Sequence, residues 1–274
     1  NTKIIINGGV FGDKSEAIDG IYAGGSGYMS QSLWRTVGKP SKDGGNIYGI
    51  EGATVASLTI NGGNFYCKNG IFAAGRGTDY YYHKKSYDGT ASDYQALGKT
   101  YGNVELNISG GTFHCPIFGG GYGVADSKLK TDSTINTLSY MARLYGQSFV
   151  TITGGTFYDN IYGGGDMAVV EYHGDGMATN LTIGDKADIR GSIFAGGNGR
   201  KKRIDTGKAD KDVKISNDTR APELVGKVIG STKVFFQGST AQAPSVYGDI
   251  YGGGNLAQVN GDTYVNIYAG NLAG

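Results

Sequence analysis

Glycine accounts for 50 of the 274 residues, whereas the chain holds only 4 prolines, and its 25 basic and 24 acidic side chains leave a net charge of +1. Without a Gly-X-Y period and abundant proline the chain is not collagen, and its 39 % hydrophobic content excludes a disordered glycine-rich linker. The balanced charge offers no field to recruit nucleic acid, and no run approaches about 18 apolar residues, so we expect no membrane insertion by this segment.

The first predicted element is a short apolar strand at residues 4–6, which leads into a glycine pair at 8–9 and then to Phe11. An isoleucine–tyrosine pair at 21–22 follows and ends in a second glycine cluster. Alternation along the strand sends every second side chain inward, and the glycine pair permits the positive φ that lets the chain turn between two faces.

The same unit returns along the whole chain. Its strands are predicted at residues 58–60, 106–108, 150–152, 181–183 and 234–236, and a further copy opens at 264–270. The Ile-aromatic pairs begin at residues 21, 71, 117, 161, 193 and 250. These pairs lie 32 to 57 residues apart, but each follows its own strand closely, so the length variation falls after the glycine cluster. A constant core with insertions at one edge is typical of solenoid proteins.

We therefore predict an all-β chain that forms one domain over residues 1–274, a right-handed parallel β-helix (solenoid) of about six to eight coils with insertions on one edge. The main insertions are expected at residues 26–57, 76–103, 122–147, 166–179 and 198–232. An extra mark at residues 47–48 indicates an additional plain coil within the first interval. A β-propeller is the rival fold, but the 32-residue interval is short for a four-stranded blade, and each copy carries two glycine clusters.

In this fold, like residues of successive copies fall into columns. Phe65, Phe113 and Phe157 are expected to stack one strand spacing apart, about 4.8 Å. Cys67 and Cys115 each follow a phenylalanine of this column by two residues, so we expect them to stack on adjacent coils as free thiols, with a disulfide bridge as the alternative.

The repeated unit resembles the right-handed β-helices of the pectin-lyase-like superfamily. More narrowly, it is similar to the Gly-Gly-x-Phe repeats of large bacterial cell-surface and autotransporter-type adhesins. The resemblance implies an extracellular location on the bacterial cell surface, and it covers a repeat pattern rather than a catalytic signature. Because the chain opens and closes inside the repeat, flanking coils of the same chain are expected as neighbours.

One polar row is predicted from the residue that follows each glycine cluster. This corner row comprises Ser26, Arg76, Tyr122, Asp166, Asn198 and Asn255. It is interpreted either as the polar start of exposed loops or as a recognition strip at the base of the insertions. The tyrosine-rich stretch with Tyr80, Tyr81 and Tyr82 adds aromatic side chains suited to sugars or protein surfaces. The expected binding residues are these three tyrosines with Arg76, Tyr122, Asp166, Asn198 and Asn255.

The superfamily resemblance also implies an enzymatic alternative. Its enzymes work from such a face with calcium-binding acidic groups, or with a carboxylate pair about 6–10 Å apart that hydrolyses a glycosidic bond. The acidic candidates are Asp126, Asp166, Glu171, Asp175 and Asp188. A catalytic set would be Arg76, Asp166, Asp175 and the proton carrier His173. No calcium-ligand spacing is present and the three histidines show no ligand spacing with cysteine, so neither a metal nor a cofactor is expected.

Two functions from different classes remain. The first is a non-catalytic adhesin segment, a rigid scaffold whose loops bind a glycan or a surface protein of a host or neighbouring cell. The second is a polysaccharide lyase or glycoside hydrolase that uses the corner row; a phage tail-spike fragment would share the fold. The basic run at residues 200–203 is diluted by nearby acids and is interpreted as a solvated loop rather than a nucleic-acid site.

Overall fold

The computed structural model describes residues 1–27, 44–50, 52–77, 97–123, 141–199, 226–238 and 243–272. All regular structure in these residues is β-strand, as the sequence predicts, and it forms three sheets whose paired strands all run parallel. The predicted Tyr80, Tyr81, Tyr82, Asp126 and basic run lie outside the described residues.

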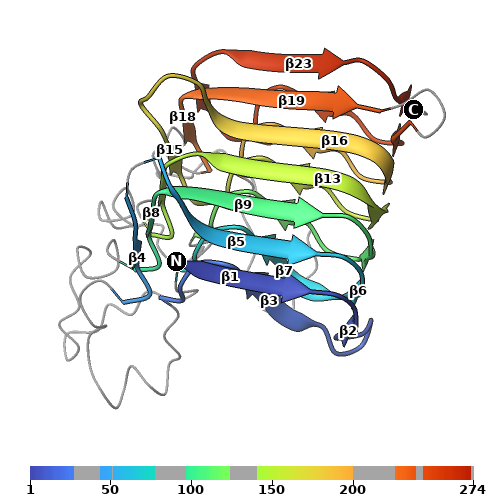
Figure 1. Cartoon of the computed structure of the whole chain (residues 1–274), viewed down its shortest axis with the longest axis horizontal. Helices are drawn as coiled ribbons and strands as arrows, with labels where there is room; N and C mark the ends of the chain where they lie inside the picture. Colours follow the sequence, from blue (N-terminus) through green and yellow to red (C-terminus); the bar gives the residue numbers. More distant parts are fainter. Residues whose placement is uncertain are drawn as a thin grey trace, which may run out of the picture.

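Sheet 1 contains 12 strands, and its long strands lie side by side in chain order (Figure 1). These are β1 (Thr2–Ile6), β5 (Thr54–Ile60), β9 (Asn103–Ile108), β13 (Ser148–Phe157), β16 (Met177–Ile189), β19 (Ser231–Gln237) and β23 (Thr263–Ile267). The short ones are β2 (Val10–Phe11), β6 (Asn64–Phe65), β10 (Thr112–Phe113), β20 (Ser245–Val246) and β24 (Asn271–Leu272).

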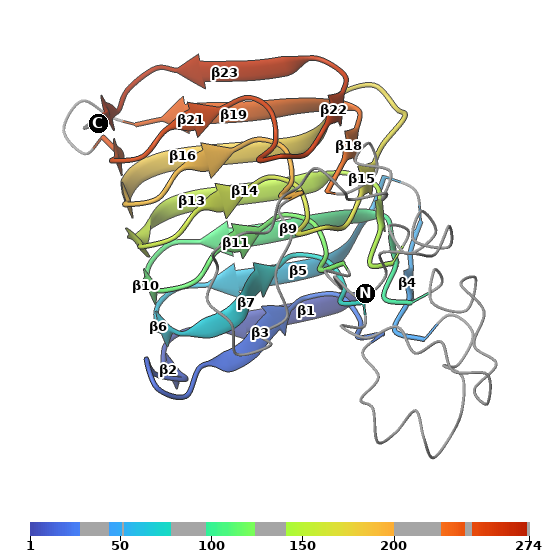
Figure 2. The same cartoon turned by 180° about the vertical axis from the view of Figure 1, so that it is seen from behind.

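Sheets 2 and 3 contain 6 strands each, and the strands of sheet 2 lie in front of sheet 1 in the view of Figure 2. Sheet 2 comprises β3 (Ile18–Tyr22), β7 (Cys67–Phe72), β11 (Ile117–Phe118), β14 (Ile161–Tyr162), β17 (Ile193–Phe194) and β21 (Ile250–Tyr251). Sheet 3 comprises β4 (Ile47–Tyr48), β8 (Thr100–Tyr101), β12 (Leu144–Tyr145), β15 (Val170–Glu171), β18 (Val228–Ile229) and β22 (Val259–Asn260).

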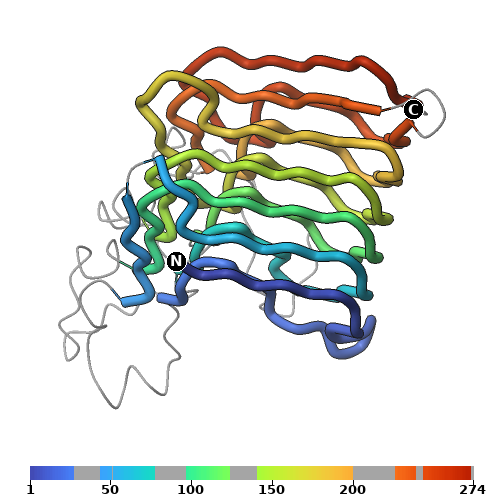
Figure 3. The backbone as a smooth tube through the Cα atoms, in the orientation of Figure 1, coloured from blue at the N-terminus to red at the C-terminus, as the bar shows by residue number. Residues whose placement is uncertain are grey.

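Each repeat passes through sheets 1, 2 and 3 in turn before the next repeat begins above it, as the colour order in Figure 3 shows. Neighbouring repeats meet in register, so that Leu58 pairs with Ile4 on one side and with Leu106 on the other. Propeller blades would instead keep the strands of each repeat in a separate antiparallel sheet. The shared parallel sheets therefore exclude the propeller.

The predicted phenylalanine column is confirmed. The ring centroids of Phe65 and Phe113 are 4.9 Å apart and those of Phe113 and Phe157 are 4.6 Å apart, with nearly parallel planes. Phe11 extends the stack at 4.8 Å from Phe65. The three inner rings are completely buried, and burying each contributes about 1.5–3 kcal/mol.

The glycine pair acts differently from the prediction. Residues before and after it belong to the same sheet, and β13 runs through Gly154 and Gly155 without interruption. Gly155 has a φ of 108°, a value that side-chain-bearing residues rarely adopt. The pair therefore bends a strand within sheet 1, because the positive φ changes its direction while the pairing on both sides continues.

The sequence does not predict sheet 3, and the strands of this sheet show that two of the predictions are wrong. Ile47 and Tyr48 pair with Thr100 and Tyr101, so the mark at 47–48 is the third strand of the first repeat rather than an additional coil. Each of the five ranges predicted as insertions also contains one sheet 3 strand. Strands of two residues show no alternation. Strands of this length also occur in sheet 2, but they are marked by a recurring Ile-aromatic pair, whereas the residues of the sheet 3 strands differ from repeat to repeat.

Cys67 and Cys115 are both free and buried, and their thiols are hydrogen-bonded to each other. The predicted stacking of free thiols on adjacent repeats is therefore confirmed. The hydrogen bond with Cys67 and the burial of the site raise the pKa of the Cys115 thiol well above its usual range.

In the last repeat, the residues equivalent to buried core residues of the inner repeats become exposed. Val265 and Ile267 pair with Val234 and Phe236, which are completely buried. Val265 is 40 % exposed and Ile267 is 45 % exposed, because no further described strand lies beyond β23. The last repeat thus presents apolar side chains that the inner repeats bury.

We predict that Phe113→Ala lowers the free energy of unfolding by about 3–5 kcal/mol, since it opens a cavity in the middle of a close-packed column. The half-buried Phe11 is the matched control, and Phe11→Ala should cost clearly less. Urea-unfolding midpoints measure both. An equal or smaller loss for Phe113→Ala would contradict the stacked column.

We also predict that neither cysteine reacts with a disulfide reagent such as DTNB in the native protein at pH 7. The thiolate is the reactive form, and burial together with a raised pKa keeps the Cys115 thiol protonated. Both thiols should react once guanidinium unfolds the chain. Rapid labelling of the folded protein, or a mass short by two hydrogens, would contradict this environment.

Candidate functional site

The corner row lies where the chain leaves sheet 2. Isolated bridges join Ser26 to Arg76 and Arg76 to Tyr122, and Asn198 is joined to Asp166 on one side and to Asn255 on the other. In the middle of the row the Asp166 N–H donates to the Gly121 carbonyl at 3.0 Å, and the Gly123 N–H donates to the Asp166 carbonyl at 2.8 Å. The row is therefore one continuous file of residues across the repeats.

Glycine before the corner allows the repeats to approach each other closely. A Cβ placed on Gly120 would lie 2.6 Å from the backbone nitrogen of Gly165, and one on Gly164 would lie 2.7 Å from that of Gly197. Backbone hydrogen bonds of 2.9–3.0 Å connect Gly120 to Gly164 and Gly164 to Gly196. A side chain at these positions would separate the repeats and displace the row.

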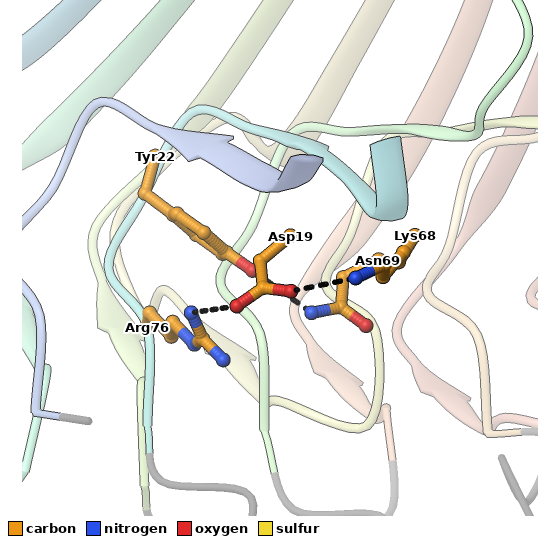
Figure 4. Close-up of polar contacts among 5 residues, drawn as sticks. All are labelled: Asp19, Tyr22, Lys68, Asn69 and Arg76. Atoms are coloured by element: carbon orange, nitrogen blue, oxygen red, sulfur yellow. Dashed lines mark hydrogen bonds and ion pairs between the residues drawn. The ribbon is translucent and has the colours of Figure 1, made fainter. Parts of the chain in front are cut away.

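Arg76 occupies the early part of the row and is only 7 % exposed. Figure 4 shows its guanidinium beside Tyr22 and Asp19. The guanidinium carbon lies 5.3 Å from the centroid of the Tyr22 ring and 5.8 Å from that of Tyr122, within the range of cation–π attraction. Arg76 Nη1 is 3.8 Å from Asp19 Oδ2, and Lys68 Nζ is 3.7 Å from Asp19 Oδ1. These contacts fix the cation against rings and a carboxylate.

Asp166 occupies the middle of the row and is completely buried. Asn198 Nδ2 donates to Asp166 Oδ1 at 2.8 Å, and Asn255 Nδ2 donates to Asn198 Oδ1 at 3.3 Å. Asn255 and Asn160 also donate to the Tyr162 hydroxyl, at 3.3 and 3.1 Å. Burial raises the pKa of Tyr162, although these two amide bonds oppose the shift. This half of the row is a hydrogen-bonded chain that joins three repeats.

The residues named for catalysis are divided between two regions. Arg76 and Asp166 lie in the corner row, whereas His173 and Asp175 lie in the exposed turn between β15 and β16. His173 Nε2 is 2.8 Å from Glu171 Oε1, and the Asp175 carbonyl accepts a bond from the Tyr172 hydroxyl at 3.0 Å. Asp166 is completely buried, whereas His173 and Asp175 are exposed.

Sequence reasoning missed the buried cation beside Glu171. Arg143 is 4 % exposed, is ion-paired with the other Glu171 oxygen and lies 5.3 Å from the Tyr145 ring centroid. Glu171 therefore joins a buried arginine to the exposed His173. The signal was the place of Arg143 directly before a sheet 3 strand, and it could not be read without knowing that sheet.

Sequence reasoning also missed a second row of stacked side chains, whose members directly follow those of the phenylalanine column in the sequence. Tyr66, His114 and Tyr158 each follow one of the stacked phenylalanines and stack on one another, with centroids 4.1 and 4.8 Å apart. The signal was in the sequence, because the position after each column residue holds an aromatic residue in three successive repeats.

We predict that Asn198→Ala lowers the free energy of unfolding by about 1–3 kcal/mol, the range for leaving a buried hydrogen-bond acceptor without its donor. Asn255→Ala should cost less, because its bonds are longer and the residue is only half-buried. Chemical denaturation of the two variants compares them. Unchanged stability of Asn198→Ala would contradict a structural role for the Asp166–Asn198 bond.

Within the described residues, no three histidine, cysteine, aspartate or glutamate side chains gather as a metal site requires. The described part of the chain also contains no helix long and apolar enough to cross a membrane. No family model, curated protein or solved structure matches the chain.

Proposed function

We propose that the three sheets belong to a right-handed parallel β-helix, and that the chain is a non-catalytic segment of an extracellular bacterial surface protein. In this proposal the stacked repeats form a rigid scaffold that presents binding loops, including the tyrosines at 80–82. The single observation that carries it is the in-register pairing of every repeat with the next, from β1 to β23. Such an array extends by adding repeats while its core stays constant.

The burial of the candidate acid–base groups favours a scaffold over an enzyme. A general acid or base must reach the proton that it transfers, directly or through one water molecule. Asp166 is completely buried and bonded to Asn198, while His173 is bonded to Glu171 in another region. The lyase or hydrolase alternative therefore loses Asp166 as an accessible acid or base.

The partners proposed for this segment are a glycan or a surface protein of a host or neighbouring cell, together with flanking coils of the same chain. The exposure of Val265 and Ile267 supports the flanking coils, because another strand beside β23 would bury both side chains and satisfy its open edge.

We predict that beads coated with the purified segment bind to a glycan or to a cell surface and release no sugar from any bound polysaccharide. Adhesion of the beads and reducing ends in the supernatant are measured in parallel, and uncoated beads are the control. Polysaccharide cleavage that Asp166→Ala abolishes would contradict the proposal and establish the enzymatic alternative. Absence of adhesion to all surfaces would reduce the segment to a spacer.

A further inference from the structure

Five successive repeats carry a large side chain at the corner where the phenylalanine-containing part of sheet 1 ends. We call this set the aromatic column, because four of its five members carry a ring; it comprises Tyr66, His114, Tyr158, Arg190 and Tyr247. Backbone hydrogen bonds of 2.7–2.9 Å keep the column in register from His114 onward. The His114 N–H, for example, donates to the carbonyl of Phe65, the residue before Tyr66, and the later members follow the same pattern. The column therefore runs in a line across the stacked repeats.

The members of the column form two groups of contacting side chains, Tyr66–His114–Tyr158 and Arg190–Tyr247. His114 stacks between Tyr66 and Tyr158 with interplanar angles of 10° and 5°. The guanidinium carbon of Arg190 lies 4.1 Å from the centroid of the Tyr247 ring. Nη2 and Nε of Arg190 also donate to Asp188 Oδ2, at 2.8 and 3.1 Å. The side chains are thus ordered before any ligand arrives, which lowers the entropy cost of binding.

The column is not needed for the core. Tyr158 is 55 % exposed and Tyr247 is 41 % exposed, whereas Phe157, one residue away, is completely buried. The position two residues earlier holds short polar side chains instead. That position is occupied by Asn64, Thr112, Thr156, Asp188 and Ser245. An exposed aromatic file of this kind is a candidate contact surface.

The geometry indicates which part of the column a ligand meets. Stacking covers the ring faces, so the ring edges, hydroxyl groups and imidazole remain for contact with solvent or ligand. These groups recur at about one strand spacing, about 4.8 Å, and both donate and accept hydrogen bonds. A ligand that matches them presents hydroxyl groups at regular intervals along an extended chain.

Charge and backbone pairing limit the chemical class of the ligand further. Arg190 is already paired with Asp188, so its charge is balanced by a carboxylate before any polyanion approaches. A peptide cannot bind here by adding a strand, because β6, β10, β13 and β16 are each paired on both sides. Both observations favour a neutral, hydroxyl-rich polymer.

We propose that the aromatic column binds one chain of a neutral linear polysaccharide along the direction in which the repeats stack. The inference rests on the proposed role of the segment in adhesion and names the site and ligand class. Because the column spans five repeats, affinity for oligosaccharides should rise with length and level off near five sugar units.

The test is electrophoresis of the folded segment through native gels that contain a soluble β-glucan, xylan or mannan. Retardation of the wild type in at least one gel is expected, and Tyr158→Ala or Tyr247→Ala should weaken it at least tenfold. Tyr264→Ala is the matched control, because Tyr264 is 42 % exposed on β23 and lies outside the column. Its retardation should equal that of the wild type.

Tyr158→Phe separates binding from stability, because it keeps the stacked ring and removes the hydroxyl. Weaker retardation with an unchanged melting temperature is the expected result. Retardation of the wild type that none of the column variants reduces would overturn the column and leave glycan adhesion standing. Failure of all three polysaccharides to retard a segment that still adheres to cells would overturn the column and direct the proposed function to a protein partner.

Discussion

Stacking of like side chains, one strand spacing apart, is the constraint on which this molecule depends. A single repeat contributes only one strand or two to each sheet and cannot cover its own apolar residues. Leu58 becomes buried because Ile4 and Leu106 flank it in register, and the phenylalanine rings become buried in the same way. Burial, sheet pairing and aromatic stacking are therefore consequences of one alignment between neighbouring repeats.

The same alignment places equivalent surface residues of successive repeats in a row. Whether the side chains of a row are buried or exposed decides whether the row can contact a partner. The corner row holds charged and amide groups, but its central members are buried and bond to one another. The aromatic column shares the backbone register of the repeats, and Tyr158, which is more than half exposed, remains accessible. The position within the repeat thus determines which residue types lie next to one another. Burial distinguishes a row that only stabilises the fold from a row that can bind a partner.

The sequence predicts those features that recur in every repeat. Inward residues such as Leu58, the stacked phenylalanines and the adjacent thiols follow from spacing alone, because one register determines them all. Sheet 3 escapes prediction because its two-residue strands show no alternation and, unlike the Ile-aromatic pairs of sheet 2, share no residue pair between repeats. The Arg143–Glu171 contact depends on that sheet, and the burial of Asp166 depends on tertiary cover that no local pattern encodes.

Nuclear Overhauser contacts between backbone protons test the central alignment most directly. The in-register parallel arrangement predicts contacts from Leu106 to both Leu58 and Val150, which are 48 and 44 residues distant in sequence. Contacts that instead pair strands antiparallel within a single repeat, with none between Leu106 and its two column neighbours, would contradict the account.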